Sequence, residues 1–157
     1  RIQFEGVDGR LMKDEWAEGA KSYLELASPG LPNFFTVTGP GSPAILTNVI
    51  GSIEHHVEWI ADYISYLRAA GITRTEATPE ATTHVAELAA MTLYPTAVSW
   101  YMGANVPGKP RVFLAYIGGL HNYRDRCEKI ATDGYPGFTH DGGTGLAARA
   151  EAVAAEV

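Results

Sequence analysis

Apolar side chains recur at spacings of three and four along the middle of the chain, which predicts one face of an α-helix. The repeating positions are Ile53, Val57, Ile60, Ile64 and Leu67. Gly71 follows where a helix commonly ends on a left-handed residue. We therefore predict a helix that buries this set of side chains and stops before Gly71.

Two further helices are predicted by their end signals. Thr78–Glu80 resembles a helix start, because Thr is a good N-cap and Pro suits the first helical position. That helix is expected to end before Pro95. A third helix is expected between Gly119 and Gly134, with apolar positions that include Leu120, Tyr123, Cys127 and Ile130.

Two runs rich in β-branched and aromatic residues predict strands. Asn33–Thr38 is apolar on both faces, which is typical of a strand buried on two sides. Arg111–Ile117 has a similar composition. Residues 1–12 alternate around an Asp-Gly turn, which predicts a short hairpin. Together with the helices, these strands predict an α/β fold.

Composition narrows the classes that the chain can belong to. Its 157 residues suffice for one domain or a piece of one, and 46% apolar with 19% charged residues excludes disorder throughout. A net charge of −6 without a basic run argues against nucleic acid as a partner. No apolar run reaches the roughly 18 residues of a membrane span. We expect a soluble, cytoplasmic protein, and the first residue, Arg1 rather than Met, suggests a fragment of a longer one.

Reactive side chains give little sign of a site of their own. His55 and His56 are adjacent in the predicted helix and point roughly 100° apart, so they cannot chelate one metal ion together. We predict no metal site. No serine lies in a Gly-x-Ser-x-Gly elbow. The single cysteine, Cys127, shares an apolar helix face with Tyr123, which favours a buried thiol over a nucleophile.

Two loops have compositions that suit a ligand. Gly39–Pro43 lies where a predicted strand leads toward a helix, a place where backbone N–H groups can meet an anion. A plain tight turn explains it equally well. Ser99–Lys109 combines an aromatic pair, a glycine and a cation, as a mobile lid would. A loop held to the core by its aromatic residues is the alternative.

Several blocks of sequence resemble the C-terminal part of Baeyer–Villiger monooxygenases of the cyclohexanone and phenylacetone type. The blocks are Pro32–Pro43, Thr47–Asn48, Ser52–Ile60, Ser99–Arg111, Tyr116–Gly119, Tyr123–Arg124 and Gly134–Phe138. They follow one another in order and cover nearly the whole chain up to about Phe138.

The resemblance implies a fold, cofactors and a reaction. Residues 1–138 would be the C-terminal part of a Rossmann-like FAD-binding domain with flanking helices and a long control loop, and residues 139–157 a C-terminal tail. The family uses FAD and NADPH. Reduced flavin reacts with dioxygen, and one oxygen atom is inserted beside the carbonyl of a ketone to give an ester or a lactone.

The resemblance also implies site residues. Cofactor-binding positions would be Thr47, Asn48 and Val49 beside the isoalloxazine ring of FAD, and Trp100, Asn105 and Lys109 in the control loop over NADP. Substrate-pocket positions would be Ile45, Leu46, Phe113 and Ala115.

The chain departs from the family in what it lacks. The Gly-x-Gly-x-x-Gly fingerprint of FAD, the NADPH-binding domain and the active-site arginine are absent, so we place no catalytic residue in this chain and expect it to be inactive alone. The missing FAD and NADPH domains would be its partners, with a ketone and O2 as substrates. Two alternatives remain: a related flavin monooxygenase that oxygenates nitrogen or sulfur, and a non-catalytic binding domain of flavoprotein ancestry.

Overall fold

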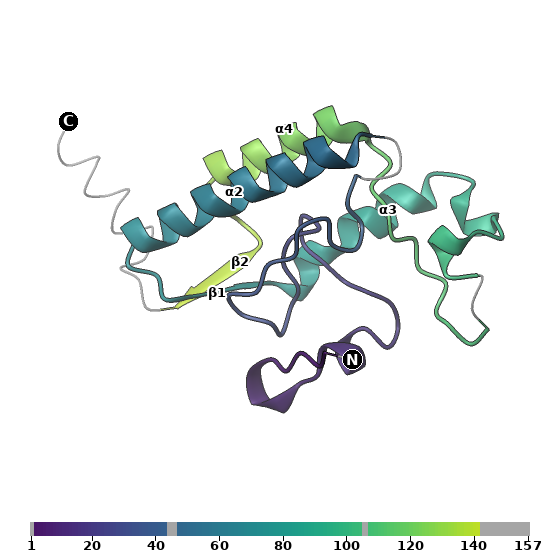
Figure 1. Cartoon of the computed structure of the whole chain (residues 1–157), viewed down its shortest axis with the longest axis horizontal. Helices are drawn as coiled ribbons and strands as arrows, with labels where there is room; N and C mark the ends of the chain where they lie inside the picture. The colour runs from purple at the N-terminus through teal and green to yellow at the C-terminus, as the bar shows by residue number, and fades with distance from the viewer. Residues whose placement is uncertain (1, 44–46, 105–106, 142–157) are drawn as a thin grey trace.

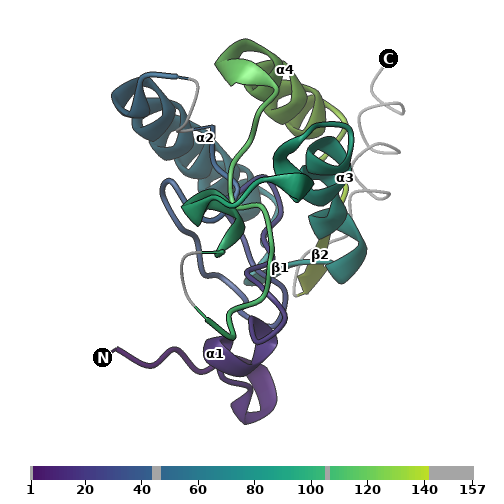
Figure 2. The same ribbon diagram turned by 90° about the vertical axis from the view of Figure 1, so that its right-hand side faces the viewer.

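The computed structural model describes residues 2–43, 47–104 and 107–141. The helices and strands within these ranges are α1 (Met12–Glu15), α2 (Val49–Ala69), β1 (Arg74–Ala77), α3 (His84–Ala90), α4 (Gly119–Thr132) and β2 (Phe138–Asp141). Helices α2 and α4 lie side by side, with the β1–β2 ribbon below α2 (Figure 1). Helix α1 lies at the opposite end of the molecule from this pair (Figure 2). The fold therefore mixes helices and strands, as predicted.

Helix α2 confirms the predicted helix but buries only part of the predicted face, where Leu67 is buried and Ile60 packs against the core. Asn48 caps its start by accepting a hydrogen bond from the Ile50 N–H at 3.0 Å, and Gly71, with φ +67°, follows its end. The buried positions are Ser52, His56, Trp59, Tyr63 and Leu67. The predicted core residues Ile53 and Val57 are instead 38% and 51% exposed, because α4 and the sheet pack against the aromatic side of the helix.

An aromatic cluster forms the main core between α2, α4 and the sheet. The Tyr63 ring lies 4.3 Å from that of Tyr135 and 4.8 Å from that of Phe138, centroid to centroid. Trp59 Nε1–H donates a hydrogen bond to the Cys127 carbonyl at 3.1 Å, which ties α2 to α4. Helix α4 was predicted correctly, and its inward face carries Tyr123 and Cys127. The core therefore depends on rings with polar tips more than on aliphatic side chains.

Strands β1 and β2 form an antiparallel pair that the sequence pattern did not reveal. Their register pairs Arg74 with Asp141 and Ala77 with Phe138. The boundary predicted after Phe138 therefore falls inside β2, while residues 142–157 lie outside the described ranges. Among the described residues, no helix is both long and apolar enough to cross a membrane.

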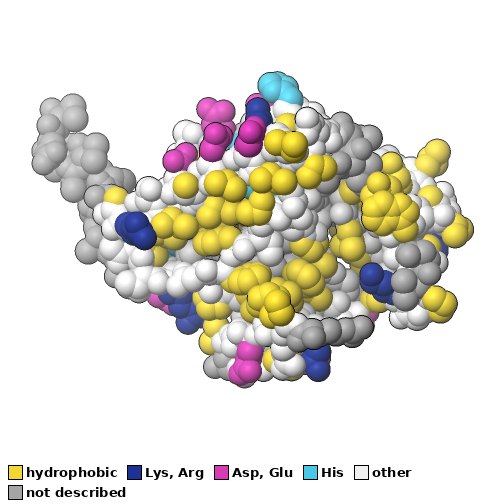
Figure 3. Space-filling model, viewed as in Figure 1, with side chains coloured by type: hydrophobic (Ala, Val, Ile, Leu, Met, Phe, Trp, Pro, Cys, Tyr) yellow, Lys and Arg dark blue, Asp and Glu magenta, His cyan; other side chains and the backbone are white. Residues whose placement is uncertain are grey.

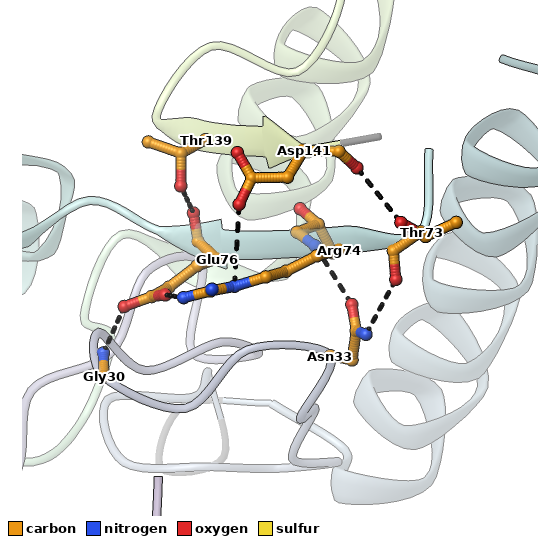
Figure 4. Close-up of polar contacts among 8 residues, drawn as sticks. Gly30, Asn33, Thr73, Arg74, Glu76, Thr139 and Asp141 are labelled. Atoms are coloured by element: carbon orange, nitrogen blue, oxygen red, sulfur yellow. Dashed lines mark hydrogen bonds and ion pairs between the residues drawn. The ribbon is translucent and has the colours of Figure 1, made fainter. Parts of the chain in front are cut away.

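Hydrogen bonds from Gly30 and Asn33 attach β1 to the turn at residues 30–33 (Figure 4). Asn33 accepts a hydrogen bond from the Thr75 N–H and donates one to the Thr73 carbonyl, each at 3.0 Å. Glu76 accepts from the Gly30 N–H at 2.7 Å and pairs with Arg74 at 3.0 Å. The bonds of Asn33 and Gly30 to β1 and Thr73 connect segments at least 40 residues apart, so tertiary contacts hold β1 on this side as well as through its pairing with β2.

The two predicted strands are wrong as regular strands. Asn33–Thr38 consists of turns with one isolated bridge between Phe35 and Ala27, and Asn33 and Thr38 have φ of +56° and +52°. Arg111–Ile117 runs without helix or strand geometry. A strand needs a neighbouring backbone to accept its hydrogen bonds, and the described residues provide no ladder for either segment.

The predicted hairpin and the predicted second helix are both present, but each is shorter or less regular than predicted. Residues 1–12 close through one bridge between Glu5 and Leu11 around a 3-10 turn at Val7–Gly9. The second helix starts as the 3-10 turn Pro79–Thr83 and continues as α3, so it is tighter at its start than predicted. Further 3-10 turns lie at Tyr94–Thr96 and Trp100–Met102.

Candidate functional site

The segment around Leu114 brings both candidate ligand loops together. The Leu114 N–H donates a hydrogen bond to the Tyr101 carbonyl at 3.3 Å, and the Leu114 carbonyl accepts one from the Gly41 N–H at 3.2 Å. Two residues on, the Tyr116 N–H donates to the Ser42 carbonyl at 3.1 Å. The glycine-rich turn and the aromatic loop, far apart in sequence, therefore lie on either side of one extended segment.

The glycine-rich turn packs against the buried segment at residues 22–26. Ser22 Oγ–H donates a hydrogen bond to the Pro40 carbonyl at 2.6 Å. Gly39 packs so closely that an added Cβ would lie 2.5 Å from the Glu25 carbonyl oxygen. Ser42 and Pro43 are buried. The turn is thus a rigid, structurally required element, and internal packing alone accounts for the glycine at position 39.

The start of α2 carries the positions predicted to face FAD. Asn48 and Val49 are exposed there, and Asn48 uses its side chain as the helix cap. Thr47 donates a hydrogen bond to the Pro43 carbonyl and lies 3.3 Å from Ser52 Oγ, so it is held inward. The pocket positions Ile45 and Leu46 lie outside the described residues.

His56 connects α2 to the chain that enters the glycine-rich turn. Its Nδ1 accepts a hydrogen bond from the Thr38 N–H at 2.9 Å. Burial, and to a smaller degree His55, lowers the pKa of His56 to about 4, so the ring is neutral and able to accept. Sequence reasoning missed this role; the polar and aromatic positions at 52, 56, 59 and 63 share helical spacing and could have indicated a second buried face.

The predicted control loop forms a 3-10 turn with one ring facing outward. Ser99 Oγ accepts from the Tyr101 N–H at 3.3 Å and so caps the turn. Trp100 is 65% exposed and packs on the Tyr101 ring with centroids 3.9 Å apart, whereas Met102 is buried. Asn105 lies outside the described residues. The loop is therefore attached to the core by Met102 and presents Trp100 at the surface.

A pocket of about 350 Å³ lies between this loop, the Leu114 segment and the glycine-rich turn. It is lined by Trp16, Gly19, Ala20, Pro40, Gly103, Lys109, Pro110, Val112 and Leu114. Phe113 and Ala115, predicted for the ketone pocket, alternate with Val112 and Leu114 and are buried in a second apolar cluster with Ala89 and Met102. The structure thus places Lys109 at this pocket and Phe113 and Ala115 in a cluster apart from it.

Two ionisable side chains, Cys127 and Glu25, are buried in the protein. Burial raises the pKa of Cys127 to about 12, so the thiol is neutral and the cysteine is a core residue. Burial also raises the pKa of Glu25 to about 8, an effect that Arg126 and Tyr123 offset only in part. Within the described ranges, no three His, Cys, Asp or Glu side chains are grouped so that they could hold a metal ion.

Known proteins similar to this chain are flavin monooxygenases. A cyclohexanone 1,2-monooxygenase from an Acinetobacter species is 42% identical over 142 residues, which cover 88% of this chain and 26% of the relative. A Baeyer–Villiger monooxygenase from Pseudooceanicola batsensis is 39% identical over 90% of this chain and 26% of its own length. A phenazine N-monooxygenase from Lysobacter antibioticus is 36% identical over 88% of this chain and 26% of its own length.

A solved structure supports the same relationship. The crystal structure of cyclohexanone monooxygenase from Rhodococcus sp. Phi1 bound to NADP+ superposes with a TM-score of 0.83 at 38% identity, over 90% of this chain and 27% of that one. No family model matches the chain. The similarity in sequence and the similarity in fold to this structure extend over the same 90% of the chain. The chain is therefore a homologue of Baeyer–Villiger monooxygenases that spans about a quarter of their length.

Proposed function

We propose that this chain is the C-terminal portion of an FAD- and NADPH-dependent Baeyer–Villiger monooxygenase. Residues 1–138 would supply the last part of its Rossmann-like FAD-binding domain. The observation that carries the proposal is the convergence at Leu114 of the glycine-rich turn and the aromatic loop, both of which carry the family resemblance. Similarity to cyclohexanone monooxygenases in sequence and in structure supports it independently.

The residues at the start of α2 suit a flavin ring. The first turn of a helix has backbone N–H groups that find no partner within the helix, and its dipole favours a hydrogen-bond acceptor. Asn48 and Val49 are exposed there, with the apolar Ile50 beside them. A flat ring with a polar edge fits such a surface. FAD reduced by NADPH would supply the two electrons for the reaction of a ketone, O2, NADPH and H+ to an ester or lactone, NADP+ and water.

In this proposal the control loop holds the nicotinamide cofactor. Trp100 offers an exposed ring for stacking, and Lys109 offers an exposed cation to an anionic nucleotide. The turn at Trp100–Met102 is anchored by buried Met102, so the loop has a fixed base and an exposed edge. Phe113 and Ala115 would shape the ketone pocket from behind, because both are buried beneath the loop.

The reaction is tested on the complete gene product. With FAD bound, it is expected to consume NADPH when cyclohexanone is added and to form a lactone with one atom from ¹⁸O2. The 157-residue chain by itself is expected to form none. Lactone formation by the chain alone would contradict the proposal, as would a complete product that oxidises no ketone in a panel of cyclic, linear and aromatic ketones.

A second candidate function is oxygenation of nitrogen or sulfur, which the similarity to a phenazine N-monooxygenase favours. The same assay distinguishes it: an N-oxide or a sulfoxide as the product, with every ketone unchanged, would establish this function instead. A complete product that binds FAD without oxidising NADPH would point to the non-catalytic alternative.

Trp100→Ala is expected to weaken NADPH binding in the complete enzyme. The side chain is 65% exposed, so its removal leaves the fold intact, while the loss of a stacking surface should raise KM for NADPH roughly tenfold, about 1.4 kcal/mol. Steady-state kinetics with varied NADPH measures this. Val98→Ala is the matched control, since Val98 is 90% exposed and directly precedes the same loop. Equal KM values for both variants and the wild type would contradict a cofactor role for Trp100.

A further inference from the structure

His56 is a polar side chain on the core face of α2. Hydrophobic side chains form a band along α2 at the surface (Figure 3), whereas the His56 ring is fully buried and lies 5.4 Å from the Tyr123 ring, centroid to centroid. Its Nδ1 accepts the Thr38 N–H, so the neutral ring carries its proton on Nε2. Among the described residues, this buried Nε2 has no hydrogen-bond partner. A buried donor without a partner costs stability, so the bond to Thr38 is what favours histidine over an apolar residue here.

Thr38 has a backbone conformation that a β-branched residue rarely adopts. Its φ of +52° lies in the left-handed region, where Cβ comes too close to the following carbonyl oxygen. A residue stays in this region only when surrounding contacts hold it there. The His56 ring supplies such a contact from α2, 18 positions further along the chain. Without it, Thr38 would relax to an ordinary conformation, and the direction in which the chain enters the glycine-rich turn would change.

The hydrogen bond between Thr38 and His56 closes residues 38–56 into a loop. This segment contains the glycine-rich turn and the start of α2, with residues 47–49, the positions proposed to face FAD. One end of the loop has a strained backbone, and the other end is a rigid helix. The position of the turn relative to the start of α2 therefore depends on the bond that joins the two ends.

We propose that His56 is a positioning residue for the flavin: by holding Thr38 in its left-handed conformation, it keeps the glycine-rich turn and the start of α2 in the arrangement that binds the isoalloxazine ring. This rests on the proposed function. His56 acts through the backbone of Thr38 and takes no part in the chemistry. The property that matters is a hydrogen-bond acceptor at the position of Nδ1, rather than the volume or the charge of the side chain.

Two substitutions in the complete gene product separate the acceptor from the volume. His56→Asn places an amide oxygen close to the position of Nδ1 but leaves a small cavity. His56→Gln fills more of the space, but its oxygen lies one bond farther out, near the position of Nε2. We expect His56→Gln to raise the Kd for FAD and to accelerate hydrogen exchange of the Thr38 amide, each roughly tenfold, as for one lost hydrogen bond. His56→Asn is expected to change both by less than about threefold. Flavin fluorescence and mass spectrometry of the peptide that contains Thr38 measure these two quantities.

His55→Gln is the matched control. His55 is the neighbouring residue on α2, and its ring also packs on Tyr123, with centroids 5.6 Å apart. It lines a surface pocket with Glu58 and Arg124, and within the described ranges it has no hydrogen bond to the glycine-rich turn. We expect this substitution to change the Kd for FAD and the exchange of the Thr38 amide by less than about twofold.

Thr38→Gly tests whether His56 acts through the strained backbone. Glycine adopts the left-handed conformation about as readily as the right-handed one, so the turn should keep its shape without the bond. In the Thr38→Gly background, His56→Gln should therefore raise the Kd for FAD by less than about threefold instead of roughly tenfold. An undiminished tenfold effect in this background would overturn the proposal, because His56 would then act by another route.

Two further results would overturn the positioning role. One is a His56→Gln variant that matches the wild type in Kd and in exchange. The other is a larger effect of His56→Asn than of His56→Gln, because the effect would then follow volume. If His56→Gln does not fold, His56→Asn still decides, since a tenfold rise in its Kd contradicts the proposal. Exchange of the Thr38 amide is measured without FAD as well, so it tests the bond by itself, whereas absence of bound FAD in the wild-type product would contradict the proposed function.

Discussion

Replacing Trp59 by alanine is expected to destabilise the α2–α4 pair by roughly 3–5 kcal/mol, the range for removing a large ring from a core. Trp59 is only 6% exposed, and its ring lies 5.3 Å from that of Tyr63 and 5.5 Å from that of Tyr135, centroid to centroid. The substitution leaves a cavity between these rings. It also removes the N–H donor to the Cys127 carbonyl, the hydrogen bond that joins the two helices.

Hydrogen exchange of α4 amides in the complete gene product measures this loss, because it reports the opening free energy of one region. Trp100→Ala is the matched control: the substitution is the same, but Trp100 is exposed, so the change should stay within about 0.5 kcal/mol. If Trp59→Ala behaves like Trp100→Ala, α4 does not pack on Trp59 as described.

Glu25→Gln is expected to stabilise the protein increasingly as the pH rises. Glu25 is 1% exposed, and no described donor reaches its Oε2. Burial raises the pKa of its carboxyl from 4.5 to about 8. Above pH 4.5 the carboxyl ionises in the unfolded chain while it stays protonated in the folded one, so ionisation pulls the wild type toward unfolding. The resulting loss of folding stability in the wild type grows with pH up to about pH 8 and then levels off. Glutamine has no such loss.

The advantage of Glu25→Gln should thus be near zero at pH 4.5 and roughly 3–5 kcal/mol at pH 8 and above. Amide exchange of the wild type and the variant, compared at the same pH from 4.5 to 8.5, measures it. Buried His56, with a pKa of about 4, destabilises the fold in acid, but it is present in both proteins and cancels in the difference. A constant difference across this range would mean that Glu25 is ionised in the folded protein.

Glu25→Gly separates charge from backbone strain. Glu25 has φ +60°, a left-handed conformation that costs a non-glycine residue roughly 1–2 kcal/mol. The glycine variant should match Glu25→Gln in its pH dependence and exceed it in stability at every pH. Because Thr36 Oγ1 and Gly39 both contact the Glu25 carbonyl, this position also supports the glycine-rich turn. A glycine variant less stable than the glutamine variant would show that the side chain contributes packing that outweighs the strain.

Hydrogen-bonding range explains which elements could be predicted. The hydrogen bonds of α2 and α4 join residues only a few positions apart, so apolar spacing and the flanking glycines were sufficient to predict both helices. Strands depend on distant partners. Asn33–Thr38 has strand composition but lies in turns, whereas β1 pairs with β2 although Arg74–Ala77 has little apolar character. Nothing local in the sequence indicated that pairing, because its partner is more than 60 residues away.

The candidate site divides in the same way. The sequence by itself determined the resemblance to a monooxygenase family, the apolar repeat of α2 with its end before Gly71, and the two loops that carry ligand-type residues. Only the tertiary structure decided that these loops meet at Leu114, that His56 holds Thr38, and that Phe113 points into a separate cluster. It also decided which face of α2 is buried. The helical period places Ile53 and Trp59 on separate faces, but which face packs depends on the surface that α4 and β2 present, and that surface exists only after folding.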